Sequence, residues 1–441
     1  MSNIFTKRPL QAFWQEAGTN VKLSMCLMGL GQLCYGQIAK GLLYLAVLAL
    51  AVYYYVRRGI QDLMGLFTLG TTEGNTWLGV EGDNSVIMLL MGILSVIALL
   101  FLIVCYVSNI KDAYETQKRC ERGGKPAHFK EDLKQLLDKK FYKTVLFFPI
   151  LGVCVFNILP IIFMIAIAFT NYGGNIVPPR LVDWVGFDNF IQIATLAQFA
   201  PTFVKILSWN LVWATVSTAV NYFAGLGLAL LLNKECVKGK VFWRAFPMLA
   251  YAVPGFITLL GFQFMFSYGG PINQIITDMG YRAIGFLDID AKWIARTIGF
   301  GVNAWISVPS IMLLATGILS NRDLSQIESA KIDGANAFQQ FRHITLPFVL
   351  FSTTPVLISQ FIGNFNNFGI FFFLRGGLYI DGYFLASDTD LLINWLYNLS
   401  INNNYYSIGA TISLVIFLIT SLLSLLIYTR SSSYKEEDTF R

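Results

Sequence analysis

The sequence predicts an all-α integral membrane protein, a polytopic bundle of about eight transmembrane helices. Of its 441 residues, 55% are hydrophobic and only 13% are charged, whereas ordinary soluble domains carry about a quarter charged residues. Its charge-free apolar runs are long enough for spanning helices, which need about 20 residues each. The predicted spans are residues 39–57, 86–107, 145–170, 207–232, 246–267, 298–320, 348–374 and 407–428.

The N-terminal apolar region is divided by Lys40 into two segments, 23–38 and 41–56, each of which is short for a span. We interpret 23–38 as an interfacial helix. A further span there would move the basic N-terminus to the side that positive charge disfavours. Residues 1–20 have no short apolar core followed by small cleavage-site residues, so we expect no cleaved signal peptide.

Positive charge predicts the orientation of the spans, because cytoplasmic loops carry an excess of Lys and Arg. Nine such residues lie in loop 108–141 and four in loop 233–244, against two in loop 171–206. Both termini and loop 321–347 are therefore expected on the cytoplasmic side. We interpret the basic loops as this orientation signal and not as a nucleic-acid site.

The predicted spans from residue 145 onward contain no Asp, Glu, Lys or Arg. Proton-coupled carriers need ionisable groups inside the membrane, so proton symport is disfavoured, although a sodium site of carbonyls and hydroxyls would escape this test. For the same reason we predict no catalytic residues. No phosphate-binding G-x-x-x-x-G-K-[ST] loop occurs, and the six cysteines lack metal-ligand spacing. Energy for transport would have to come from another chain.

Loop 321–347 combines helical spacing with turn residues. A short helix is predicted in its first half, with Asp323 or Asn321 as the N-cap. Gly334 breaks this helix, and Asn336 can cap a second helical turn. The periodicity fits either an amphipathic surface loop or a helix-turn-helix displayed on one membrane face.

Two polar stripes occupy the later spans. Their Asn and Ser side chains could simply form hydrogen bonds between helices, and this alternative stays open. A neutral sugar, however, requires amides that match its hydroxyls together with aromatic ring faces, without charge. The residues that favour a sugar are Asn303, Ser307 and Ser310 on one face, Gln360, Asn364 and Asn367 on another, and the aromatic residues Trp305, Phe361, Phe365 and Phe368.

The polar loop also carries a recognisable pattern. It resembles the EAA loop of ABC-importer permeases, although Ser329 stands where Ala is usual. The resemblance implies a coupling helix that docks in a groove of a cytoplasmic ATPase subunit. The residues that match are Ile344 and those that would make this contact, which are Glu328, Ala330, Asp333, Gly334, Ala335, Phe338, Leu346 and Pro347.

The resemblance extends in order from about residue 142 to 430. IAIAFTNY at 165–172, AYAVPGF at 250–256, VNAW at 302–305, NFNNF at 364–368 and DLLINWLY at 390–397 are similar to the larger permease subunit of maltose/maltodextrin ABC importers, the MalF-like family. It implies a type I importer permease fold. By residue identity it places Asn303, Asn364 and Asn367, with Tyr251 on a weaker match, in the cavity that holds the sugar.

Several positions depart from the family pattern. Ser307 and Ser310 stand where Gly and Tyr are usual, and Gly363 replaces a Phe. These residues and Gln360 complete the predicted substrate site, and the smaller side chains leave room for a longer oligosaccharide. The large domain that some members insert after the third helix is absent from loop 171–205, as in versions from bacteria with a single membrane.

The resemblance implies a bacterial plasma-membrane protein in three parts. Residues 1–141 form an N-terminal membrane region with two spans and a basic loop, 142–430 the permease core, and 431–441 a cytoplasmic tail. The chain would bind no cofactor itself. Expected partners are a second permease, two ATPase subunits that bind ATP-Mg, an extracellular sugar-binding protein, an oligosaccharide and lipid. A stand-alone secondary carrier, a non-transporting scaffold or receptor, and a different substrate such as a galacto-oligosaccharide are the alternatives.

Overall fold

The helical bundle expected from the sequence is confirmed by a computed structural model. It describes residues 15–74, 81–127, 129–234, 236–321 and 325–430, in which there are many helices and no β-strand beyond two isolated bridges. The chain divides into two compact units at Gly186 and Phe187. The predicted functional boundary at residue 142 stays a prediction.

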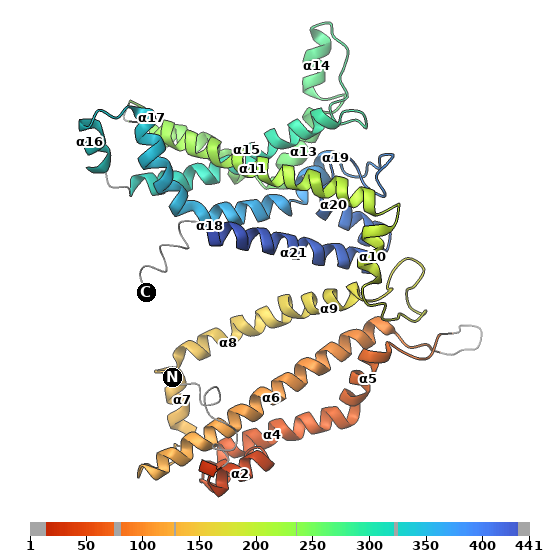
Figure 1. Cartoon of the computed structure of the whole chain (residues 1–441), viewed down its shortest axis with the longest axis vertical. Helices are drawn as coiled ribbons and strands as arrows, with labels where there is room; N and C mark the ends of the chain where they lie inside the picture. Colours follow the sequence, from red (N-terminus) through yellow and green to blue (C-terminus); the bar gives the residue numbers. More distant parts are fainter. Residues whose placement is uncertain (1–14, 75–80, 128, 235, 322–324, 431–441) are drawn as a thin grey trace. The chain divides into compact units, whose positions relative to one another are not determined.

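The first unit is built around one long helix, α6, which ends well beyond its apolar portion (Figure 1). Two short helices, α2 and α3, replace the single interfacial helix predicted for 23–38, and Gln32 holds them to α6 by donating to the Asn109 carbonyl at 2.9 Å. The helices are α2 (Thr19–Cys26), α3 (Leu30–Cys34), α4 (Ile38–Tyr54), α5 (Ile60–Thr68), α6 (Ser85–Glu121), α7 (Phe129–Leu137), α8 (Phe141–Val153) and α9 (Leu159–Ala168). Short π-helical turns join α4 to α5 and α8 to α9.

The second unit is a bundle in which α11 packs along both α15 and α18, and α18 packs on α21 (Figure 1). Helix α14 projects from one end, and α16 lies at the opposite end. The helices are α10 (Asp188–Thr195), α11 (Ala200–Asn233), α12 (Lys240–Ala252), α13 (Gly255–Met265), α14 (Pro271–Asp278), α15 (Lys292–Ser320), α16 (Ser325–Ile332), α17 (Ala337–Gln340), α18 (Leu346–Phe365), α19 (Gly369–Arg375), α20 (Leu392–Tyr397) and α21 (Tyr406–Arg430).

Seven of the described helical segments are long and apolar enough to cross a membrane, and a bent pair could supply an eighth. The bent pair corrects the straight span expected at 246–267, because α12 and α13 meet at 90°. Val253 is extended there, as is usual before a proline, and Pro254 has no N–H to continue the helix. The span predicted at 348–374 is likewise interrupted between α18 and α19.

The orientation predicted from charge can be tested by cysteine accessibility in a background without the six native cysteines. We expect single cysteines at Asp183 and Asp381 to react with an impermeant reagent from outside. Cysteines at Lys118 and Gln326 should react only after permeabilisation, because their loops lie on the side favoured by positive charge. Labelling of intact cells at Gln326 would contradict both the orientation and a cytoplasmic role for loop 321–347.

Candidate functional site

The two predicted polar stripes face one another across a cleft between α15 and α18. Its volume is about 310 Å³. Six of the eight predicted substrate residues line it, with two neighbours that the prediction omitted. The lining residues are Asn303 and Ser307 on α15, Val356, Ser359, Gln360, Gly363 and Asn364 on α18, and Asn367 just after α18.

The other two predicted residues do not line this cleft. The Ser310 hydroxyl donates to the Ser307 carbonyl of its own helix at 2.8 Å. Tyr251 is exposed on α12. Ser359, which the prediction omitted, lies one helical turn before Gly363, so the same spacing argument could have included it.

The three asparagines form a directional chain of hydrogen bonds. Asn367 donates through Nδ2 to Asn303 Oδ1 at 3.4 Å, and Asn303 donates through Nδ2 to Asn364 Oδ1 at 3.3 Å. Asn364 in turn donates to the Thr218 hydroxyl on α11 at 3.0 Å, and Asn367 Oδ1 accepts from the Ile370 N–H at 3.2 Å. The chain therefore links three helices of the bundle.

The same bonds leave each amide with spare capacity. Asn303 and Asn364 are only 3% and 5% exposed, and their hydrogen bonds to one another and to Thr218 also hold the helices together. An asparagine amide has two N–H groups and two carbonyl lone pairs. The hydrogen bonds among these residues use one N–H and one lone pair of each asparagine. The cleft contains no charged side chain. It can therefore both donate to and accept from the hydroxyls of a neutral ligand.

Gly363 leaves open space on the cleft side of α18. A Cβ at this position would meet no heavy atom within 4 Å, and the residue has no left-handed backbone that would require glycine. Neither packing nor backbone conformation therefore explains the glycine. A larger side chain here would project into the cleft and reduce its volume.

None of the four aromatic residues expected beside the stripes lines this cleft. Phe365 is buried in a core with Phe361 packed against it, and Phe368 stacks on Phe372 with ring centroids 4.5 Å apart. Trp305 lies instead in a separate pocket of about 350 Å³ between α11, α12 and α15. The sequence predicted the polar side of the site but not the direction of these rings.

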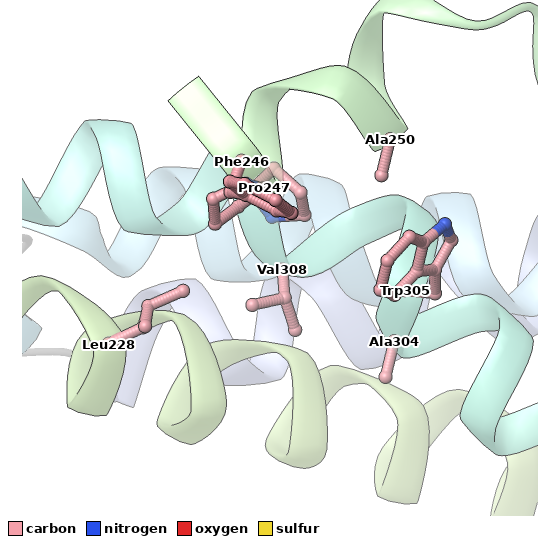
Figure 2. A pocket seen from close by; sticks show the side chains of 8 residues that line it. Leu228, Phe246, Pro247, Ala250, Ala304, Trp305 and Val308 are labelled. Atoms are coloured by element: carbon pink, nitrogen blue, oxygen red, sulfur yellow. The ribbon is translucent and has the colours of Figure 1, made fainter. Parts of the chain in front are cut away.

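The Trp305 pocket is apolar. Figure 2 shows side chains from three helices turned toward one space, with the indole ring at its edge. It has few polar groups to match sugar hydroxyls, so it does not extend the amide cleft chemically. Its lining residues are Leu228, Phe246, Pro247, Ala250, Ala304, Trp305, Val308 and Pro309.

The helix-turn-helix predicted in loop 321–347 is confirmed. Gly334 has φ +81°, a left-handed conformation that favours glycine. Asn336 caps α17 as predicted: its Oδ1 accepts from the Gln339 N–H at 2.9 Å, and Gln339 Oε1 accepts from the Asn336 N–H at 2.8 Å. Asn321 instead terminates α15, and Asp323 lies outside the described residues.

The predicted docking residues form an accessible surface at the end of the second unit. Phe338 is 66% exposed, so the loop presents a large apolar side chain at this end of the unit. Ile327, on the inner side of α16, is buried and anchors the loop. Glu328, Asp333, Gly334, Phe338 and Pro347 are exposed, and Ala330, Ala335 and Leu346 are partly buried.

A buried charged cluster escaped the sequence analysis. The Arg375 guanidinium pairs with the Asp388 carboxylate, and Arg296 donates to the Asp388 carbonyl while stacking 3.7 Å above the Trp209 ring. Burial raises the pKa of the neighbouring Asp390 carboxyl to about 6, although hydrogen bonds from Ser387 oppose the shift. The cluster holds two loops together at the end of the bundle opposite α16.

Comparison with known proteins gives consistent matches. Residues 221–432 match the family described as "Binding-protein-dependent transport system inner membrane component". The chain is 34% identical to the maltodextrin transport system permease protein MdxF of Bacillus subtilis, covering 93% of this chain and 95% of that protein. It is 33% identical to the galactooligosaccharides transport system permease protein GanP of Bacillus subtilis, with coverages of 93% and 96%. A solved bacterial ABC transporter involved in alginate import shares the fold, with a TM-score of 0.55 and 20% identity over 68% of this chain and 97% of that chain.

Proposed function

The chain belongs to the family of binding-protein-dependent ABC-importer permeases, and we propose that it moves maltodextrin-type oligosaccharides into the cell. The observation that supports this substrate class is the amide cleft between α15 and α18. Its lining offers donors and acceptors without charge, which suits a neutral polyhydroxyl ligand. The open space at Gly363 suits an oligosaccharide of several units.

We propose that the energy comes from two ATPase subunits at the cytoplasmic face, one of which docks on α16 and α17. ATP-Mg binds to these partner subunits. The exposed Phe338 beside the left-handed Gly334 turn supports a protein contact at this point. A stand-alone carrier would not need such a surface. A second permease and an extracellular sugar-binding protein complete the proposed importer, which lies in the bacterial cell membrane with both termini cytoplasmic.

A galacto-oligosaccharide is the second candidate substrate, because one relative with almost the same coverage is named for its transport. The amide cleft accepts hydroxyls from either sugar class. Competition by unlabelled galacto-oligosaccharides during maltodextrin uptake separates the two. Uptake of labelled galacto-oligosaccharides without any uptake of labelled maltodextrins would identify the second candidate as the substrate.

Loss of an amide from the cleft should weaken sugar-dependent transport. Asn303→Ala, Asn364→Ala and Asn367→Ala each leave a sugar hydroxyl poorly paired in a partly dehydrated cleft. We expect a loss of about 1–3 kcal/mol, or roughly five- to a hundredfold, at each position. The measurement is uptake of labelled maltodextrins of several lengths by importers normalised for assembly, since the same amides also link helices.

Asn366→Ala is the matched control. Asn366 directly precedes Asn367 but lines a different cleft, and its Nδ2 donates to the Ile362 carbonyl at 3.3 Å. Its replacement should leave uptake near the unsubstituted level. If all three cleft variants transport every length normally once assembled, the asparagines serve packing alone and the proposed sugar site is wrong.

A further inference from the structure

Helix α7 has an apolar face that no described part of the chain covers. Phe129, Leu133, Leu136 and Leu137 recur at helical spacing and therefore share one side. Their exposed fractions range from 37% to 62%. This face of a nine-residue helix would be costly to leave in water, so it needs an occupant.

The charges of α7 are distributed unevenly around this face. At 3.6 residues per turn, Lys130 and Lys134 lie along one border of the apolar side. Glu131 points elsewhere, because its Oε2 lies 3.5 Å from Arg119 Nη2 on α6. Within Phe129–Leu137 two lysines and two carboxylates cancel, but across residues 125–143 there are six lysines and three carboxylates, so the flanking residues give the segment a net charge of +3. The occupant should therefore combine apolar and anionic character.

The position of α7 identifies such an occupant. The Thr144 hydroxyl, at the first residue of the Thr144–Ala168 span, donates to the Leu136 carbonyl at 2.9 Å. The helix is therefore fixed at the point where the chain enters the membrane. Figure 1 shows α7 crossing the end of α8 and not extending it, which is the direction of a helix that lies along a membrane surface.

We propose that α7 is a membrane-surface helix that recognises anionic phospholipid headgroups. Its apolar face enters the boundary between headgroups and acyl chains, and Lys130 and Lys134 contact the phosphates, as in other basic interfacial helices. Such a contact would fix the connection between α6 and α8 to the lipid. This role is independent of the proposed sugar substrate.

The test uses the full-length chain in nanodiscs of phosphatidylcholine, with or without one-third phosphatidylglycerol. Amide hydrogen exchange over residues 129–137 should slow when the anionic lipid is present. In the double variant Lys130→Gln, Lys134→Gln the protection given by the anionic lipid should be weaker, by roughly fivefold in exchange rate for each lysine removed. Leu133→Ser should raise exchange in both lipids. Lys238→Gln, an exposed lysine in another loop, is the matched control and should change nothing in α7.

A second measurement identifies the lipid directly. A photoactivatable phosphatidylglycerol should crosslink to the 129–137 peptide in the unsubstituted chain and much less in the double lysine variant. Equal exchange in both nanodiscs together with no crosslink would overturn the proposal. It would also be overturned by protection that appears only after ATPase addition, which would indicate a protein partner, or only at high protein density, which would indicate a second copy of the chain.

Discussion

Gly334→Val is expected to uncouple the proposed importer while the chain still reaches the membrane. At φ +81° an L-residue is strained by about 1–2 kcal/mol, and a β-branched side chain tolerates this conformation least. The turn would relax into another conformation and move Phe338 away from α16. Sugar-stimulated ATP hydrolysis should then fall about tenfold or more, because the proposed docking surface for the ATPase is displaced.

The control for this result is a glycine with the same backbone problem in another place. Gly123 has φ +79°, and a Cβ there would meet nothing within 4 Å, as at Gly334. Gly123→Val should therefore carry similar strain but leave stimulated hydrolysis intact. Loss of activity in both variants would point to general destabilisation, and normal hydrolysis in Gly334→Val would remove the loop from coupling.

The coupling loop could be predicted in detail because its determinants are local. Glycine at a left-handed turn and asparagine at an N-cap act within a few residues, so the sequence carries their signal. Of the two N-caps predicted for α16, Asn321 belongs to the end of α15 and Asp323 lies outside the described residues. The spans were likewise predictable from composition, but the bends within them were not. The 90° bend at Val253 and Pro254 changes no hydropathy, although the proline was a usable signal.

The cleft was predictable only in part. Helical spacing placed Asn303 and Ser307 on one face of α15, and the neighbouring helix then determined which members of each stripe meet. Spacing says nothing about that neighbour, so the rings of Trp305 and Phe365 were assigned to the wrong side. The hydrogen bond from Asn364 to Thr218 could not be predicted from the sequence either, because it joins residues 146 positions apart.

The buried charged cluster around Arg375 was not predicted either, because its members are also far apart in the sequence. Asp388 and Arg375 lie 13 residues apart, both after the end of the predicted span 348–374, and Arg296 lies 92 residues before Asp388. In sequence they read as ordinary loop charges. In the structure Arg375 is only 3% exposed, and its guanidinium also donates to the Leu287 and Ile289 carbonyls at 3.0 and 2.9 Å.

Arg375→Met is expected to destabilise the second unit severely. The substitution keeps much of the side-chain length but leaves the buried Asp388 carboxylate without its cation and the 287–289 carbonyls without a donor. Removing one partner of a buried ion pair costs about 3–5 kcal/mol, since the remaining charge stays desolvated. The measurement is the thermal unfolding midpoint of the purified chain in detergent, together with its level in the membrane.

Two companion variants distinguish this cause from a general effect of losing a cation. Lys205 donates to the Gly382 carbonyl at 3.0 Å, in the loop that carries Asp388. Because Lys205 is exposed, Lys205→Met should cost little stability. Combining Arg375→Met with Asp388→Leu should recover part of the lost stability, because the carboxylate that would otherwise stay buried without Arg375 is then removed. A midpoint in Arg375→Met equal to that of Lys205→Met would show that the ion pair does not hold the loops. Failure of the double variant to recover would instead assign the loss to the carbonyl contacts at 287–289, which the methionine cannot replace.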